Sequence, residues 1–382
     1  MKILLVHNNY QSKFIGGEDV VFWRELSALR KRLGEDNVLE YVVYNDDIKI
    51  FKLLFTIWFS RKHYNEIYKI VKKNNIDLVH VHNFYPLLTP SIFKAAKKAG
   101  AKTIQTLHNY RWWCISGIFY RRDCGICELC AQKKLPYPGI FYKCYRGSFL
   151  QSLVTALAFF FYKIVNQIRY IDKFFALSEF EYKEVIGLGL DPKKVILKPN
   201  FVSVENINIS DKNDYIYVGK LDESKGVLEL LKVWQKLDRK YVLRLVGSGE
   251  LDGQINNFKS DNIIFLGKLD NKTTLREIAK AKYLIVPSLW YETFGLTIIE
   301  AMALGVPAIG FNIGTRIELI KNEENGFISD VKNLKDVIEK SYNFSDYEKI
   351  SRNAKTFANN YSEEKIIADQ ISIYEKILNN NL

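Results

Sequence analysis

Two glutamates with seven residues between them, Glu292 and Glu300, carry the clearest chemical signal in the sequence. Glu292 precedes a Thr-Phe-Gly turn, and Glu300 lies in an Ala/Met/Leu-rich run typical of a buried helix. A helix rises about 1.5 Å per residue, so we expect Glu300 roughly 7–8 Å deeper than the helix mouth at Gly295. Carboxylates at two depths can accept hydroxyl hydrogen bonds from the two ends of one ligand. Because an unpaired buried carboxylate is costly, we interpret Glu300 as ligand-binding rather than as merely buried.

Three loops after predicted strands have the residues that bind phosphate. The first, 219–226, contains Lys220 and Lys225, and the second, 247–250, is Gly-Ser-Gly-Glu, which allows close backbone approach. The third, 292–295, opens a helix, whose free N–H groups and positive dipole end favour an anion. Each loop alone also matches an ordinary turn. Together, two lysines and a helix N-terminus predict a diphosphate site that needs no metal ion.

A glycine pair, Gly16 and Gly17, precedes a helix that we predict over 18–33. No G-x-G-x-x-G pattern occurs here, so a dinucleotide-binding fingerprint is not predicted. An ordinary turn and a close approach to a ligand are both open for this pair.

Short apolar strands alternate with helices along the whole chain, which predicts right-handed crossovers and parallel sheets. We expect an α/β protein whose ligand lies at the carboxyl ends of the strands. Strands are predicted over 2–6, 77–83, 102–109, 173–179, 215–219, 241–249, 262–267, 283–288 and 305–310, with helices near 225–237 and 315–321.

A chain of 382 residues is too long for one ordinary core, so two domains are expected. The change of domain is predicted within 191–206, which is rich in turn formers. We expect a first domain over 1–195 with a cysteine-rich insertion at 111–147, a second domain over 196–361, and a closing C-terminal helix within 362–382.

The net charge of +12 lies almost entirely in the first half of the chain. Residues 1–195 hold 30 Lys and Arg against 17 Asp and Glu, whereas residues 196–382 hold 25 against 26. This asymmetry favours an anionic partner for the first half, either lipid, a diphosphate-bearing substrate or nucleic acid. The alternative is a solvated basic surface. We expect a cytoplasmic protein, because no secretory signal opens the sequence and no apolar run reaches the roughly 18–20 residues that span a bilayer.

Two apolar-aromatic stretches with basic flanks, 51–64 and 149–163, match either core helices or helices lying on an anionic membrane surface. Together with the basic charge they favour peripheral association with the inner face of the membrane. His80 and His82 are two residues apart in a predicted strand and point to one face, where we favour a structural placement over a metal pair.

All five cysteines lie within 108–148. Three of them, Cys124, Cys127 and Cys130, form a C-x2-C-x2-C run, and Cys114 and Cys144 flank it. This spacing matches a four-thiolate zinc site, whereas disulfides are not expected in a cytoplasm. Reduced thiols in a loop are the alternative.

These motifs resemble those of the retaining glycosyltransferases of family 4. The matching stretches are G-K-L-x-x-x-K-G at 219–226, E-T-F-G-L-x-x-x-E-A-M-A-x-G-x-P at 292–307, G-T-x-x-E-L-I at 314–320 and N-G at 325–326. The resemblance implies the GT-B fold, with two Rossmann-like doubly wound domains facing a central cleft and the sugar nucleotide mainly on the second.

The resemblance also implies roles for individual residues. Glu300 would bind the ribose, Glu292 would lie near the donor sugar, and Lys225 would bind phosphate. Lys220 stands where the family commonly has arginine, which keeps the charge but loses the planar fork. His108 matches a histidine beside the transferred sugar, so His108, Glu292 and Lys225 are the candidate catalytic residues. The further donor-binding candidates are Gly16, Gly17, Thr293, Phe294, Gly295 and Leu296.

By this resemblance we expect a hexosyltransferase that retains the anomeric configuration and needs no cofactor for catalysis. Its donor would be a UDP-sugar, with GDP-mannose as second choice, and its acceptor a lipid-linked glycan of bacterial capsule, O-antigen or exopolysaccharide synthesis. The departing phosphate is the favoured proton acceptor, so no protein base is assigned. A similar cysteine-bearing insertion occurs in family members from surface-polysaccharide clusters. There the zinc ligands would match Cys114, Cys127, Cys130 and Cys144, with Cys124 spare.

Two other functions compete with this expectation. A nucleotide-sugar epimerase or sugar-phosphate synthase would keep the fold, but the basic, aromatic first half argues against it. A nucleic-acid-binding protein would use the cysteines and the basic half. That function leaves Glu292 and Glu300 unexplained, and we expect no nucleic-acid partner.

Overall fold

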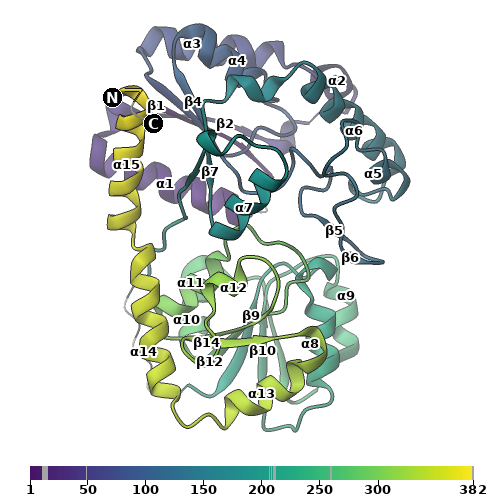
Figure 1. Cartoon of the computed structure of the whole chain (residues 1–382). Helices are drawn as coiled ribbons and strands as arrows, with labels where there is room; N and C mark the ends of the chain where they lie inside the picture. The colour runs from purple at the N-terminus through teal and green to yellow at the C-terminus, as the bar shows by residue number, and fades with distance from the viewer. Residues whose placement is uncertain are drawn as a thin grey trace. The chain divides into compact units, whose positions relative to one another are not determined.

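The computed structural model describes residues 1–10, 16–48, 50–205, 207, 209, 212–258 and 260–380. Phe14 and Ile15 of the predicted glycine loop, the side chain of Phe51, and the last two residues of the predicted closing segment lie outside this description. The chain divides into two compact units, which we describe separately (Figure 1). Unit 1 comprises Met1–Phe119, Glu128–Asn200 and Glu363–Leu382, and unit 2 comprises Tyr120–Cys127 and Phe201–Ser362.

The core of unit 1 is a six-stranded parallel sheet in the order β2-β1-β3-β4-β7-β8. Its central strands β1 and β3 are buried along their full length, because helices cover both faces of such a sheet. The strands are β1 (Ile3–Asn9), β2 (Val38–Tyr44), β3 (Leu78–Val81), β4 (Lys102–Thr106), β7 (Lys173–Ala176) and β8 (Val195–Leu197).

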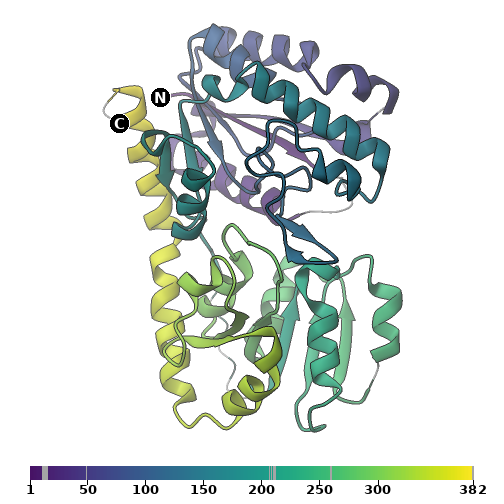
Figure 2. The same cartoon turned by 45° about the vertical axis from the view of Figure 1, so that its right-hand side comes forward.

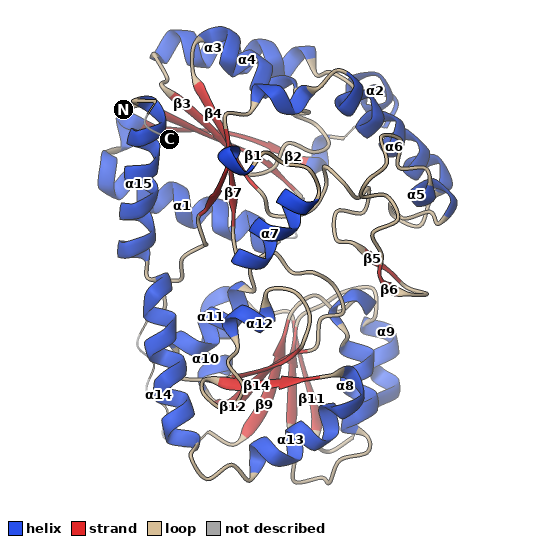
Figure 3. Ribbon diagram, in the orientation of Figure 1, coloured by secondary structure: helices blue, strands red, loops and turns tan. Residues whose placement is uncertain are grey.

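Helices pack on the sheet of unit 1, with α3 beside α4 and α1 beside α15 (Figures 1 and 3). The last helix, α15, belongs to unit 1 although it follows unit 2 in the sequence, so both chain ends lie on the same unit. The helices are α1 (Gly17–Leu33), α2 (Ile50–Thr56), α3 (Arg61–Asn74), α4 (Ser91–Ala99), α5 (Pro138–Phe141), α6 (Phe149–Ile164), α7 (Glu179–Gly187) and α15 (Glu363–Leu378).

The core of unit 2 is a second six-stranded parallel sheet, in the order β11-β10-β9-β12-β13-β14. Its strands are β9 (Asp214–Val218), β10 (Leu243–Val246), β11 (Ile263–Gly267), β12 (Ala281–Val286), β13 (Ala308–Phe311) and β14 (Gly326–Ser329). Its helices are α8 (Val227–Trp234), α9 (Asp252–Ile255), α10 (Asn271–Ala279), α11 (Leu296–Ala303), α12 (Arg316–Leu319), α13 (Leu334–Tyr342) and α14 (Tyr347–Ala358).

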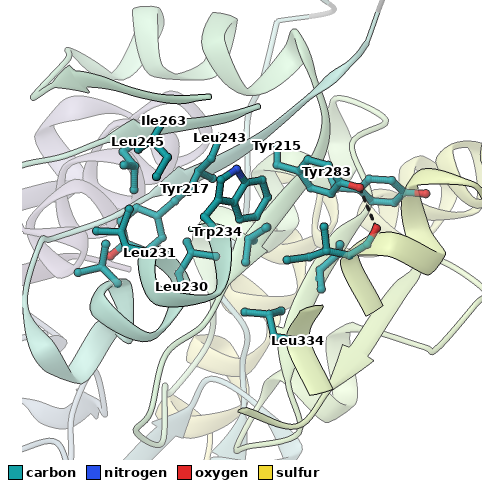
Figure 4. Packing of buried hydrophobic residues seen from close by; sticks show 14 of the residues in the cluster. Tyr215, Tyr217, Leu230, Leu231, Trp234, Leu243, Leu245, Ile263, Tyr283 and Leu334 are labelled. Atoms are coloured by element: carbon teal, nitrogen blue, oxygen red, sulfur yellow. Dashed lines mark hydrogen bonds between the residues drawn. The ribbon is translucent and has the colours of Figure 1, made fainter. Parts of the chain in front are cut away.

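Aromatic side chains fill the core of unit 2 and keep their polar atoms paired (Figure 4). The fully buried Trp234 donates its indole N–H to the carbonyl of Tyr241 at 2.9 Å. Tyr215 stacks on Tyr283 with 5.7 Å between ring centroids, and its hydroxyl donates to the carbonyl of Ile338 at 3.1 Å. Such rings bury a large area, and their polar ends must find partners inside. This core makes the sheet a rigid support for the loops at its edge.

The cysteine-bearing segment contains a short antiparallel hairpin, β5 (Tyr120–Arg121) and β6 (Gly125–Ile126), which Figure 2 shows clearly. None of the helices that the structure describes has both the length and the apolar character needed to cross a bilayer.

Candidate functional site

The strand order of unit 2 changes direction between β9 and β12. Numbered along the unit, the order is 3-2-1-4-5-6, so the helices that follow β9 and β12 leave toward opposite faces of the sheet. Doubly wound domains bind ligands at this point, at the carboxyl ends of the strands. The two loops there are 219–226 and 287–295, which contain the predicted lysines and Glu292.

These two loops touch through their backbones. The amide of Leu289 donates to the carbonyl of Ser224 at 2.8 Å. Gly226 has a φ of +67°, and a Cβ at this position would come within 1.9 Å of the carbonyl oxygen of Pro287. Only glycine adopts this conformation while leaving that space free. Gly226 therefore lets the lysine loop lie directly against the glutamate loop.

Lys225 and Glu292 form the centre of the site. The ammonium of Lys225 lies 2.6 Å from Oε1 of Glu292, and the hydroxyl of Ser288 donates to the same oxygen at 2.7 Å. The guanidinium of Arg316 lies 3.8 Å from Oε2. Lys225 also stands over the ring of Trp290, 5.0 Å from its centroid, a cation–π arrangement. Residues from three loops thus converge on one carboxylate.

The two cations keep Glu292 ionised although it is buried. Burial alone would raise the pKa of Glu292, but the charges of Lys225 and Arg316 outweigh it and lower the pKa to about 2. Arg316 is itself fully buried and donates to the carbonyls of Ser288 at 2.7 Å and Phe311 at 3.1 Å. One anion and two cations leave the cluster with an excess positive charge, which favours an anionic ligand.

The glutamate pair and the residues between them follow the predicted order. Glu292 and Glu300 are both buried, and Glu300 lies within α11. Gly295, with a φ of +93°, is the N-cap residue of α11, and Leu296 is its first residue. The side chain of Phe294 packs edge-on against Tyr361 at 5.6 Å, so it anchors the loop while its backbone stays at the helix start. Thr293 is also buried.

Two other predicted phosphate-binding elements lie outside this cluster. The side chain of Lys220 is 65% exposed and pairs with Asp222 at 3.3 Å. In the loop 247–250, a Cβ at Gly247 would come within 1.8 Å of the carbonyl of Gly219. The backbone of this loop therefore approaches the neighbouring loop of the protein rather than a ligand. This contact is enough to explain why a glycine is needed at position 247.

In unit 1 the strand order changes direction between β1 and β3, and polar side chains gather at the ends of the strands. Glu18 accepts hydrogen bonds from Asn83 at 2.8 Å and from Asn109 at 3.3 Å. Gly16 is the N-cap residue of α1, and its amide donates to Asp19 at 2.7 Å. Gly17 is exposed and has open space around it.

His108 follows β4 at this edge. Its Nε2 lies 2.9 Å from Nδ1 of His82, and the two rings stack with 5.1 Å between centroids. Burial lowers the pKa of His82 to about 3 and that of His108 well below its usual range, so both rings are neutral at pH 7. His80 bonds Tyr374 at 2.6 Å and Thr106 at 2.7 Å, which gives both predicted strand histidines partners within the protein.

No disulfide joins any of the five cysteines, so all of them are thiols. In the described part of the chain, the potential metal-ligand group whose donor atoms all lie within 4.8 Å of one another is Glu25, His80 and His82. No three of the cysteines meet that criterion there. The cysteine donor set suits zinc.

Four residues of these clusters were not predicted. Ser288 and Arg316 support Glu292, whereas Glu18 and Glu25 serve the polar edge of unit 1. Arg316 lies within the Gly-Thr motif at 314–320. Its position in that motif was the only sequence feature that could have indicated a role in the site. Nothing in its local sequence distinguishes a buried arginine from an exposed one.

Two family models match the chain over adjoining stretches. "Glycosyltransferase Family 4" matches residues 20–206 and "Glycosyl transferases group 1" matches residues 202–360. Together they cover the sheets of both units except the first strand.

Individual relatives match a smaller part of the chain than the two family models do together. The chain is 26% identical over 221 residues to an "uncharacterized 41.2 kDa protein in cps region" of Klebsiella pneumoniae, covering 53% of this chain and 61% of that protein. It is 29% identical over 175 residues to the "capsular polysaccharide biosynthesis glycosyltransferase CapM" of Staphylococcus aureus, covering 42% and 46%. The alignments thus span less than two thirds of these curated relatives.

The fold has close structural counterparts. The crystal structure of Anabaena Alr3699/HepE in complex with UDP and glucose matches with a TM-score of 0.69 at 16% identity, covering 98% of this chain and 100% of that one. At this identity the likeness shows the fold alone. It confirms the α/β GT-B class with two doubly wound domains that the sequence predicts.

Proposed function

We propose that this chain, which belongs to the glycosyltransferases with a family 4 domain and a group 1 domain, is a hexosyltransferase. It is proposed to take its sugar from a nucleotide-sugar donor. The observation that carries this proposal is the Lys225–Glu292–Arg316 cluster at the strand-order change of unit 2. It combines an anion-binding edge with an ionised carboxylate that accepts hydroxyl hydrogen bonds.

In the proposed reaction the donor diphosphate lies between Lys225 and the N-terminus of α11. Both groups would stabilise the charge that builds on the leaving diphosphate, the preorganised electrostatic effect that usually dominates catalysis. Lys220, which is exposed in the same loop and paired with Asp222, is proposed to make a smaller contribution. These charges come from the protein, so the proposed catalysis needs no metal ion.

The bond between the anomeric carbon and the phosphate oxygen breaks, and a bond to the acceptor hydroxyl forms on the same face, with retention of configuration. The hydroxyl proton passes to the departing phosphate, so no protein base is required. Glu292 and His108 are proposed to support the positively charged, oxocarbenium-like sugar and its hydroxyl groups. Glu300, deeper in α11, is proposed to bind the ribose.

A UDP-sugar is the favoured donor, with GDP-mannose second. The solved structure with UDP and glucose supports this choice, because it shares the fold over nearly the whole chain. The test is a panel of UDP- and GDP-sugars supplied with bacterial membrane lipid extract, measuring nucleotide release and glycolipid formation. We expect one UDP-sugar to give both products. Nucleotide release without any glycosylated product would argue against transfer.

The proposed acceptor is a lipid-linked glycan of capsule, O-antigen or exopolysaccharide synthesis, used at the inner membrane face. A surface polysaccharide is supported by the relative in a cps region and by the relative from capsular polysaccharide biosynthesis. In unit 1, Trp58, two residues beyond the end of α2, contacts Phe161 of α6 with 6.1 Å between ring centroids. Large apolar side chains are exposed on α2, α5 and α6: Phe55 (82%), Phe141 (71%), Leu150 (64%) and Ile164 (60%).

The helix α6 shows why the sequence left two alternatives open. Ala156, Phe159 and Tyr162 are buried in unit 1, whereas Phe149 and Leu150 are exposed. The helix thus packs on the core with one set of apolar residues and leaves another set exposed. Exposed apolar side chains in the part of the chain that carries the basic excess suit an anionic bilayer, so the protein is proposed to bind the cytoplasmic membrane face peripherally.

Structural zinc stays a prediction from the cysteine spacing, with Cys114, Cys127, Cys130 and Cys144 as proposed ligands. We expect about one zinc per purified chain by elemental analysis, following the ligand count. A metal content near zero, with all five thiols reacting readily, would remove this proposal.

A further inference from the structure

Glu25, on α1, is the hub of a buried polar network in unit 1. Its Oε2 accepts from Lys198 at 2.7 Å. Its Oε1 accepts from Gln370 at 2.6 Å and lies 3.2 Å from a ring nitrogen of each of His80 and His82. All five side chains are at most 5% exposed. This network connects α1, β3 and α15 to His108, because the second ring nitrogen of His82 bonds Nε2 of His108 at 2.9 Å.

The three residues Glu25, His80 and His82 could be read as a metal site, but their partners argue against it. Lys198 already neutralises the carboxylate, and a metal ion would lie beside that ammonium. Both ring nitrogens of His80 bond hydroxyl groups, those of Tyr374 and Thr106. Protein groups thus already bond the atoms that would bind an ion, although Oε1 of Gln370 has no hydrogen-bond partner in the described part of the chain. The network is better explained as one that fixes the positions of protons.

The hydrogen-bond rules then determine where the protons are. The charge of Lys198, with hydrogen bonds from His80 and His82, outweighs burial and holds the pKa of Glu25 well below its usual range, so Glu25 is ionised and can only accept. His82 must therefore carry its single proton on Nε2, which faces Glu25. Its Nδ1 is then an acceptor, and Nε2 of His108 must donate to it. A neutral His108 protonated on Nε2 has an Nδ1 that only accepts.

We propose that Glu25 and His82 are positioning residues that hold His108 in the tautomer protonated on Nε2. The functional part rests on the proposed sugar transfer: a sugar hydroxyl that meets Nδ1 of His108 must donate its hydrogen bond there. Neither Glu25 nor His82 needs to touch the substrate. They act through the orientation and the proton of His108, as second partners of functional histidines generally do.

The variant Glu25→Gln tests this chain of hydrogen bonds from Glu25 through His82 to His108. Lys198 can only donate, so the amide oxygen of the glutamine must face it and the amide nitrogen takes the place of Oε1. Gln370, which donates to Oε1 in the wild type, must then turn its amide so that its oxygen accepts from this nitrogen. Nε2 of His82 then has to accept, and its proton moves to Nδ1. His82 would donate to Nε2 of His108, whose own proton moves to Nδ1. The variant is therefore expected to invert both tautomers while keeping the side-chain shape.

The measurement is long-range ¹H–¹⁵N NMR of perdeuterated full-length protein labelled with ¹⁵N-histidine. The five histidines are assigned from single substitutions. We expect His108 and His82 of the wild type to show the Nε2–H pattern, and Glu25→Gln to show the Nδ1–H pattern for both. A wild-type His108 protonated on Nδ1 overturns the proposal, and so does a folded Glu25→Gln with unchanged patterns. The wild-type spectrum decides alone if the variant does not fold.

Glu66→Gln is the matched control, because Glu66 bonds His63 at 3.2 Å outside this network. It should leave the His108 signals unchanged. In the transferase assay we expect Glu25→Gln to lower kcat/KM about tenfold, the size of one lost hydrogen bond. The NMR result does not depend on turnover, so an inactive wild type would contradict the proposed function and leave the tautomer result standing.

Discussion

At the scale of single residues, the molecule concentrates its chemistry around one ionised carboxylate. Glu292 is buried, yet Lys225 and Arg316 keep it charged and Ser288 orients it. The carboxylate and Lys225 are readable from sequence, because both lie in motifs that follow strands. Arg316 and Ser288 are not, because only the folded loops bring them to Glu292. The tautomer of His108 is likewise set by Glu25, which is far from it in sequence.

Lys225→Met should weaken donor binding and turnover together. The substitution removes a charge that we place on the diphosphate, so we expect kcat/KM for the donor to fall by roughly 100-fold. Initial rates of nucleotide release measure this effect. Lys220→Met is the control, since Lys220 is largely exposed and outside the cluster, and its loss should cost less than tenfold. Equal losses for both lysines would contradict the assignment of Lys225.

Glu292→Gln should change how stability depends on pH. The pKa of Glu292 is lowered from 4.5 to about 2, so its contribution is present above pH 4.5 and is lost as the pH falls toward 2. That contribution is about 3 kcal/mol in wild type. We expect the urea midpoint of wild type to fall more steeply between pH 5 and 3 than that of the variant. Parallel curves would show that Glu292 is not held ionised.

At the scale of elements, the predicted strands are present, and three strands of the two six-stranded sheets were missed. The strands β2, β8 and β14 each lie at an edge of a sheet. The strands β8 and β14 are only three and four residues long, and β2 is half exposed although its sequence, VLEYVVY, is largely apolar. These strands depend on the neighbour they pair with. Conversely, β1 extends to Asn9, beyond the predicted end at residue 6, because His7 is buried against Asp19.

Gly226→Ala should disrupt the contact between the two site loops. A Cβ there would overlap the carbonyl of Pro287, and the positive φ adds strain. We expect the free energy of unfolding to drop by about 2–3 kcal/mol or more, with loss of donor binding. Gly253→Ala is the matched control, because a Cβ at Gly253 would have no atom within 4 Å and should be nearly neutral. Urea denaturation compares the two, and similar stabilities would refute the contact.

At the scale of the whole molecule, sequence predicted the two-domain α/β fold and the placement of charge. The basic excess lies in residues 1–195, and the exposed apolar residues of α2, α5 and α6 belong to the same part of the chain. Sequence could not decide between core and surface for these helices, since apolar residues at helical spacing serve both. Only burial in the folded unit separates the apolar residues that pack in the core from those that are exposed.

Membrane binding is the prediction that belongs to this scale. Vesicles with anionic phospholipid should sediment the protein, neutral vesicles should not, and binding should weaken with salt. Phe55→Ser with Phe141→Ser should reduce binding at least tenfold, because both side chains are largely exposed. Ile264→Ser, at an exposed apolar position of unit 2, is the control. If the bound fraction did not change with lipid charge or with these substitutions, the proposed membrane-binding surface would be contradicted.

A crystal structure with an unreactive UDP-sugar analogue tests the central claim most directly. We predict that the diphosphate lies at the N-terminus of α11 within hydrogen-bond reach of Lys225, with the ribose on Glu300 and the sugar beside Glu292. An analogue bound at full occupancy elsewhere, with this edge of unit 2 left to solvent, would contradict the account.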